Sequence, residues 1–278
     1  MVEHGATMEQ RSEPGRESEA RETIRSARHP LLVRMGAILS GADRHSCLLE
    51  GERLLQDALQ CGVAIEVVLV SDQREEHALE LERKGLSVRR VDADLLGRKS
   101  ALRASPGIAA IAALPRWRTI EELGPDRDAL VLVVAGVSDP GNLGALARSA
   151  EAAGARGLVV VAGGAHPWND KSLRGSMGSL LRLPVAFCAT AAEASAGLGA
   201  SGFRSVAAAT RAGAPYGSFN WSGRVALWIG AETGLDPREM QGFERVTIPM
   251  RPPVESLNVT VAASLLLFAA RRADVPRS

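Results

Sequence analysis

The second half of the chain alternates short apolar runs with helix-forming segments, and this alternation restricts the fold more than any other feature. The run ALVLVVAG leads through a Gly/Pro/Asp turn into NLGALARSAEAAG, and the run RGLVVVAG follows. Three more apolar runs come later, LPVAFC, FRSVAAAT and RVALWIG. Apolar strands separated by helices form parallel sheets that helices cover on both faces. We therefore predict an α/β fold with a parallel sheet for residues 129–278. Further helices are expected in DKSLRGSMGSLL and from Val254 to Arg272.

The region before this sheet predicts a smaller α/β unit. Leucines at helical spacing in CLLEGERLLQDALQCG indicate a helix that ends at Gly62, and AIEVVLVS and LSVRRVD favour strands on either side of a charged helix. Residues 1–27 alternate Glu and Arg without an apolar period, so a disordered or frayed tail is expected there. The predicted organisation is a tail (1–27), a small unit (28–114), a linker (115–128) and a larger domain (129–278).

Composition excludes several classes of protein. The formal net charge of +1 gives no overall attraction to nucleic acid, so any basic surface must be local. The three cysteines share no CxxC spacing, and the five histidines form no metal-type pair. This pattern favours a reducing compartment and argues against a disulfide framework or a zinc site. The apolar runs are too short to cross a bilayer and no secretory signal is visible. A cytoplasmic protein without a membrane partner is expected.

The segment VAGVSDPGNLGALARSAEAAGA begins like a nucleotide-binding turn but does not continue as one. Its glycines do not have the G-x-G-x-x-G spacing, and no Lys-Ser/Thr follows as in a P-loop. This disfavours a Rossmann dehydrogenase. Thermal stabilisation of the protein by NADH would favour that alternative again. Asn142 opens the predicted helix and is well placed as its N-cap. Arg148 lies among Ala and Leu near the strand carboxyl ends, where α/β proteins bind ligands. An arginine in a cleft needs an anionic or acceptor partner there.

Two further strand-to-loop junctions carry glycine or polar residues. WIGAETGLDP contains Gly230, Gly234 and Glu232, and TIPMRPPVESLNVTVAASLLLFAARR brings Ser256 and Asn258 before a long apolar helix. Glycine allows a ligand to approach the backbone closely. Each junction taken alone is an ordinary turn or helix cap.

Taken together and in order, the three segments strongly resemble the three motifs of the SpoU/TrmH family of RNA ribose 2′-O-methyltransferases, in the SPOUT superfamily. KSLRGSMGSLLRLPVA is similar to the family's segment between the first two motifs, and LLEGERLLQDALQCGVAIEVVLVSD resembles its small L30e-like substrate-binding domain. The resemblance covers roughly residues 30–272. It implies a trefoil-knotted parallel sheet preceded by the L30e-like domain. It also implies a homodimer formed through the SPOUT domain, with the sites near the subunit interface.

The implied activity is methyl transfer from S-adenosyl-L-methionine to a ribose 2′-hydroxyl of structured RNA, rRNA rather than tRNA, with no DNA partner and no metal. The alternative is a catalytically inactive RNA-binding paralogue. Because an arginine has a pKa above ~12, electrostatic stabilisation suits Arg148 better than general-base catalysis. The resemblance assigns cofactor binding to Thr210, Gly230, Ile248, Met250 and Leu257, and catalysis and active-site structure to Asn142, Arg148, Glu232, Ser256 and Asn258.

The sequence departs from the family pattern in a few places. Thr260 stands where many relatives have serine, MRPPVES is rich in proline, and GAETGL is shorter than the form in several members. Basic residues that could contact RNA are Arg34, Arg44, Arg53, Arg98, Lys99, Arg103, Lys171 and Arg174.

Overall fold

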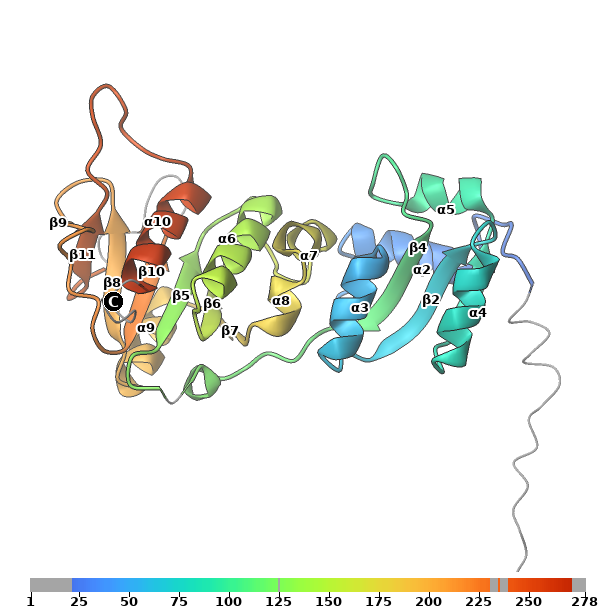
Figure 1. Ribbon diagram of the computed structural model, residues 1–278, viewed down its shortest axis with the longest axis horizontal. Helices are drawn as coiled ribbons and strands as arrows, with labels where there is room; N and C mark the ends of the chain where they lie inside the picture. Colours follow the sequence, from blue (N-terminus) through green and yellow to red (C-terminus); the bar gives the residue numbers. More distant parts are fainter. Residues whose placement is uncertain (1–21, 125, 231–234, 236–239, 272–278) are drawn as a thin grey trace, which may run out of the picture.

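The computed structural model describes residues 22–124, 126–230, 235 and 240–271, and within them the chain forms two sheets joined by an extended linker (Figure 1). The first sheet has the order β1-β4-β2-β3; β4 is antiparallel to β1 and β2, and β2 is parallel to β3. The elements of this first unit are α2 (Pro30–Leu39), β1 (Ser46–Glu50), α3 (Glu52–Gln60), β2 (Ile65–Ser71), α4 (Glu75–Arg83), β3 (Val88–Val91), α5 (Ala93–Lys99) and β4 (Ile108–Ala113).

The second unit contains a seven-stranded sheet with the order β7-β6-β5-β10-β8-β11-β9. Every strand pairing described in it is parallel, so the predicted parallel α/β fold is confirmed. Its elements are β5 (Leu130–Ala135), α6 (Pro140–Ala152), β6 (Gly157–Val161), α7 (Asp170–Ser176), α8 (Ser179–Arg182), β7 (Val185–Cys188), α9 (Ala191–Ala200), β8 (Arg204–Ala209), β9 (Ala214–Pro215), β10 (Val225–Ile229), β11 (Glu244–Thr247) and α10 (Val259–Arg271), with the short helix η1 (Ile120–Glu122) in the linker.

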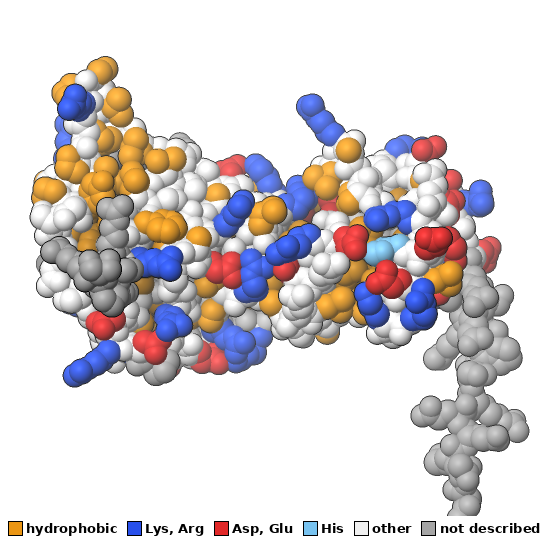
Figure 2. Space-filling model, in the orientation of Figure 1, with side chains coloured by type: hydrophobic (Ala, Val, Ile, Leu, Met, Phe, Trp, Pro, Cys, Tyr) orange, Lys and Arg blue, Asp and Glu red, His pale blue; other side chains and the backbone are white. Residues whose placement is uncertain are grey.

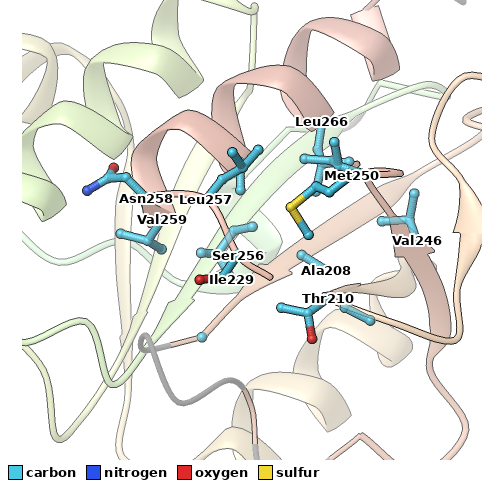
Figure 3. Close-up of a pocket in the computed structure, with 14 residues that line it drawn as sticks. Ala208, Thr210, Ile229, Val246, Met250, Ser256, Leu257, Asn258, Val259 and Leu266 are labelled. Atoms are coloured by element: carbon cyan, nitrogen blue, oxygen red, sulfur yellow. The ribbon is translucent and has the colours of Figure 1, made fainter. Parts of the chain in front are cut away.

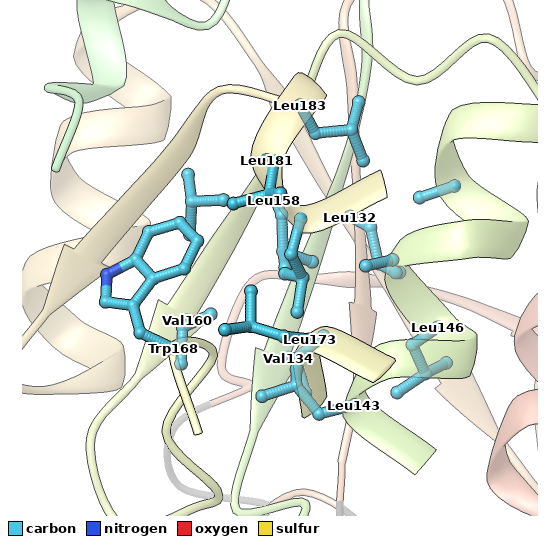
Figure 4. Packing of buried hydrophobic residues seen from close by; sticks show 14 of the residues in the cluster. Leu132, Val134, Leu143, Leu146, Leu158, Val160, Trp168, Leu173, Leu181 and Leu183 are labelled. Carbon is cyan, nitrogen blue, oxygen red and sulfur yellow. The ribbon is translucent and has the colours of Figure 1, made fainter. Parts of the chain in front are cut away.

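Helices cover both faces of this sheet, as strands that are buried throughout require. One apolar cluster joins the sheet to α6, α7, α8 and α10, and Figure 4 shows part of it around Leu132, Leu158 and Leu173. A second cluster packs α9 on the opposite face, around Trp228. The first cluster also includes Leu54 and Leu55 of α3, so the two units share a continuous core.

Close packing of α6 against α7 depends on Gly144. A Cβ atom at this position would lie 2.7 Å from the backbone nitrogen of Ser176, so no larger residue fits without movement of the backbone. The two helices therefore approach closely because the interface lacks a side chain. This contact fixes the position of α7 beside the carboxyl end of β5.

Three sequence predictions about element boundaries were wrong. Residues Ser46–Glu50 are a fully buried strand, so the helix predicted from residue 47 begins only at Glu52. The single helix expected in DKSLRGSMGSLL is divided into α7 and α8, because Met177 and Gly178 have φ of 50° and 86°. The last helix begins at Val259 and not at Val254. There Asn258 Oδ1 accepts the backbone N–H of Thr260 at 2.9 Å, as the side chain of an N-cap residue does.

The expected N-terminal tail is shorter than predicted. Ile24 is 8% exposed, pairs with Val91 beside β3 and donates its N–H to Arg90 O at 2.8 Å. This apolar side chain packs on the first sheet, so ordered structure already begins inside the predicted tail of residues 1–27. The rest of that tail, residues 1–21, lies outside the described residues.

The linker pairs with the second sheet on its way to β5. Arg118 forms a parallel bridge with Ala186 of β7, and its N–H donates to Val185 O at 2.8 Å. Next to it, Trp117 packs against Trp168 and Phe187, with ring centroids 5.5 and 5.3 Å away. The linker thus continues the sheet beyond its outermost strand.

Within the described residues, no helix has the length and apolar character needed to cross a membrane. No group of three or more His, Cys, Asp or Glu side chains in that part of the chain is arranged to hold a metal ion.

Candidate active site

A cavity of about 330 Å³ lies at the carboxyl ends of three neighbouring parallel strands, β8, β10 and β11 (Figure 3). Its volume falls at the lower end of the ~300–1,000 Å³ usual for small-molecule sites. The start of α10 and the loop before it form the remaining wall. The residues that line it are Ala208, Ala209, Thr210, Ile229, Gly230, Val246, Ile248, Met250, Ser256, Leu257, Asn258, Val259, Ala262 and Leu266.

The described cavity wall is apolar with a few neutral polar groups. Thr210, Ser256 and Asn258 supply hydroxyl and amide groups, and Figure 3 shows the Met250 thioether among the aliphatic side chains. Gly230 has no side chain, so the backbone at the end of β10 is accessible to a ligand. Aliphatic walls with backbone and hydroxyl groups suit a flat, partly apolar molecule such as a nucleoside.

Next to the cavity, the first turns of α10 and α6 are joined through side chains. The Thr260 hydroxyl donates to Asn142 Oδ1 at 3.4 Å. One turn further along α10 and two turns further along α6, the hydroxyls of Ser264 and Ser149 lie 2.8 Å apart. These two links hold the helix that carries Asn258 against the helix of the first motif.

Asn142 is not the N-cap of α6, which corrects the structural role expected for it. The cap is Asp139, whose Oδ1 accepts the Asn142 backbone N–H at 2.8 Å. The Asn142 side chain is therefore free to face Thr260. Asp139 also accepts from Lys171 Nζ at 2.7 Å, and this hydrogen bond, with that from Asn142, lowers the pKa of the Asp139 carboxyl.

Arg148 lies outside the cavity. The side of α6 that faces the sheet is buried, including Leu146, Ala147 and Ala150, whereas Arg148 is exposed on the outer side. Within the described part of the chain, neither a hydrogen bond nor an ion pair holds its guanidinium. A single chain therefore does not bring Arg148 to the cavity wall.

The sequence analysis located much of this site but not all of it. All five residues assigned to the cofactor line the cavity, together with Ser256 and Asn258. Asn142 does not line the cavity, but its side chain contacts Thr260, the residue after the lining residue Val259. Glu232 lies outside the described residues. Sequence reasoning missed the apolar part of the wall, because such residues in a strand or helix look like ordinary core. For those on strands, a position near the strand end was the available signal, and those on α10 had none. The missed residues are Ala208, Ala209, Ile229, Val246, Val259, Ala262 and Leu266.

The basic residues considered for RNA contact fall into two groups. Arg34, Arg53, Lys171 and Arg174 are held in ion pairs with carboxylates. The others have no carboxylate partner among the described residues, and all of them except the half-buried Lys99 are exposed. This second group is Arg44, Arg98, Lys99 and Arg103.

A cavity at the carboxyl ends of parallel strands, closed by the start of a helix, defines an α/β domain that binds a small cofactor at the edge of its sheet. A family model described as the SpoU rRNA Methylase family matches residues 129–268. The chain belongs to this family.

Individual relatives cover most of the chain. It is 32% identical to the 23S rRNA (guanosine(2553)-2'-O)-methyltransferase RlmP of Bacillus subtilis (strain 168), over 81% of this chain and 88% of the relative. An AdoMet-bound rRNA methyltransferase from Sinorhizobium meliloti matches with a TM-score of 0.82 and 26% identity, over 91% of this chain and 98% of that structure. The SpoU methyltransferase AviRb from Streptomyces viridochromogenes, in complex with AdoMet, matches with a TM-score of 0.81 and 27% identity, over 90% and 99%.

Proposed function

We propose that the protein transfers the methyl group of S-adenosyl-L-methionine to a ribose 2′-hydroxyl of ribosomal RNA. The observation that carries the proposal is the convergence of two sequence-distant motifs on one cavity at the strand ends, with the first motif directly behind it. The family and the relatives reported above support the same reaction.

The cofactor fits the chemistry of this cavity. Its neutral, largely aliphatic wall suits the adenosine part, and the backbone at Gly230 can donate to or accept from it. We assign this binding to Thr210, Gly230, Ile248, Met250 and Leu257. When bound, the cofactor supplies an activated methyl group on a sulfonium.

The protein's own task is to align a ribose hydroxyl with that methyl group and to stabilise the charge that develops on its oxygen. Ser256 and Asn258 stand at the cavity wall, where they can orient the ribose. Asn142 braces the start of α10 through Thr260. The role of Glu232 stays a prediction from the family motif.

A homodimer is part of the proposal. The outer side of α10 exposes apolar residues at helical spacing, Val261, Leu265 and Phe268, between 40% and 49% exposed. Figure 2 shows hydrophobic side chains gathered over this helix and the loop before it. An exposed apolar stripe of this kind favours a partner surface. A second copy seated there would also cover the outer side of α6, where Arg148 could serve the partner's site.

The trefoil knot, the L30e likeness of the first unit, a larger domain of residues 129–278 and a cytoplasmic location complete the proposal. The cysteines support the last point, because all three are free thiols.

Transfer of a labelled methyl group to ribosomal RNA, followed by mapping of the modified nucleotide, tests the function. A single ribose-methylated position is expected. Binding of S-adenosylhomocysteine and RNA without any methyl transfer would favour the inactive paralogue. Methyl transfer to tRNA alone would show that tRNA, and not ribosomal RNA, is the substrate.

A further inference from the structure

Two carboxylates of the first unit are buried where the second unit covers them. The side chain of Glu50, the last residue of β1, is 2% exposed, and that of Asp57 in α3 is 5% exposed. The second unit supplies a cation for each, since Arg174 of α7 lies 3.4 Å from Glu50 and Arg182 of α8 lies 3.1 Å from Asp57. A buried carboxylate without a partner is strongly unfavourable. Glu50 takes its cation from the second unit, whereas Asp57 also pairs with Arg53 of its own helix at 3.2 Å.

Both arginines are also held from within the second unit. Arg174 pairs with Asp170 one turn earlier on α7. Arg182 makes a two-pronged contact with Glu151 of α6, with Nε–Oε1 and Nη2–Oε2 distances of 2.7 and 2.9 Å. A two-pronged contact fixes the plane of a guanidinium. The cations are thus preorganised to receive the first unit.

The break between α7 and α8 is shaped by the same contact. Gly178 has a φ of 86°, and a Cβ atom there would lie 2.8 Å from Asp57 Cγ. The glycine leaves room for the carboxylate of the other unit. Figure 1 shows α7 and α8 on the side of the second unit that faces the first.

A continuous set of contacts leads from this interface to the active site. On α7, Lys171 precedes Arg174 by one turn and pairs with Asp139, the cap of α6. That cap holds the backbone of Asn142, whose side chain contacts Thr260 beside the cavity.

The Glu50 oxygen that faces Arg174, Oε2, also accepts the Ala101 backbone N–H at 3.3 Å. Ala101 belongs to the segment that follows α5. The exposed Arg103 lies in this segment, and the exposed Arg98 lies in the last turn of α5. Glu50 therefore connects this basic segment to α7.

We propose that Glu50, Asp57, Arg174 and Arg182 are positioning residues, which hold the first unit at one orientation so that RNA bound to it presents a single ribose to the cavity. This inference rests on the proposed function. Buried ion pairs add little net stability, but they disfavour other arrangements in which a charge is buried alone. Methyl transfer is sensitive to misplacement of the ribose, so a fixed orientation of the unit that binds the RNA raises kcat/KM for RNA.

The test compares Glu50→Gln, Arg174→Met and the double variant in methyl transfer to ribosomal RNA. We expect kcat/KM for RNA to fall about tenfold in each single variant, mainly through KM, with cofactor affinity within about twofold of wild type. The kcat/KM of the double variant should be no lower than that of the less active single variant, because each single substitution already removes the same contact. Arg174→Lys, which keeps the charge, should recover part of the loss.

Glu82→Gln is the matched control. Glu82 pairs with Arg90, whose side chain is 4% exposed, entirely within the first unit. This variant should lower the melting temperature without raising KM for RNA. If KM for RNA rises as much in Glu82→Gln as in Glu50→Gln and Arg174→Met, the effect is due to general destabilisation and the proposal is overturned.

A wild-type KM for RNA in both Glu50→Gln and Arg174→Met would also overturn the proposal. Losses in kcat/KM that add fully in the double variant would do the same. If the wild-type protein binds ribosomal RNA but transfers no methyl group, the proposed function fails. The same variants, compared for RNA affinity, then still test the positioning role.

Discussion

The Thr260 hydroxyl donates to Asn142 Oδ1 across 3.4 Å, and this contact joins residues from opposite ends of the second unit. It places the first sequence motif directly behind the cavity wall formed by the last one. The contact uses only the hydroxyl of Thr260, so a serine at this position could make it as well.

Removal of this contact should impair catalysis more than cofactor binding. We expect Asn142→Ala to lower kcat by about 10- to 100-fold, because a small displacement of the groups that align the ribose is costly. Thr260→Ser should keep most activity, and Thr260→Val should behave like Asn142→Ala. Steady-state methyl transfer and calorimetric binding of S-adenosylhomocysteine measure the two effects. Full activity of Thr260→Val would exclude a role for the hydrogen bond.

Arg148→Ala should keep cofactor affinity and lose most turnover. If Arg148 serves the site of a second copy, mixing this variant with the cavity-filling variant Gly230→Phe should restore activity. Random exchange makes half the dimers mixed, each with one competent site, so about a quarter of wild-type activity is expected. No recovery would place Arg148 at its own chain's site, and unchanged activity of Arg148→Ala would remove it from the mechanism.

The apolar stripe on α10 should hold the dimer together. Leu265→Asp and Phe268→Asp place a charge on side chains that are 40% and 43% exposed, so folding should be little affected while association weakens. Light scattering after size-exclusion chromatography should show monomers. Leu79→Asp is the matched control, since Leu79 of α4 is 38% exposed on the first unit. A monomeric wild-type protein would contradict this prediction.

Gly144→Ala should destabilise the protein by about 1–3 kcal/mol, because the added methyl group overpacks the α6–α7 contact. Gly36→Ala in α2 is the control, since a Cβ there would meet nothing within 4 Å. That change should be neutral or stabilising by up to about 1 kcal/mol, as alanine favours the helix. Thermal unfolding of both variants measures the difference. A melting temperature of Gly144→Ala at or above that of the wild-type protein would disprove the close packing.

Thiol titration should find one reactive cysteine in the folded protein. Burial raises the pKa of Cys47 to about 12 and that of Cys188 to about 11, so neither forms much thiolate at pH 8. Cys61 is exposed, although partial burial raises its pKa too. A disulfide-exchange reagent should therefore modify one thiol slowly at pH 8 and three in denaturant. Three reactive thiols without denaturant would contradict the burial of Cys47 and Cys188.

Local pattern was sufficient for the sheet. The apolar runs of β5, β6 and β10 predicted buried parallel strands, because such strands are apolar on both faces. Gly230 and Ser256 were assigned from the resemblance of their segments to the family motifs. These signals depend on neighbours in the sequence.

Features that depend on contacts between distant segments could not be predicted. The break at Gly178 lies against Asp57 of the other unit, which leaves no room for a side chain there, and nothing beside Gly178 in the sequence indicates that carboxylate. Asn142 looked like a helix cap because its residue type favours one, but Asp139 occupies that position. Its side chain is instead used by a residue 118 positions away.

The bridge from Arg118 to Ala186 has a consequence for any shortened form of the protein. The outermost strand of a sheet presents unpaired backbone groups, which can recruit strands from other molecules. Here the linker covers part of β7 and so protects that border. A fragment that starts at residue 129 would leave β7 bare and should aggregate more readily than one that starts at residue 115.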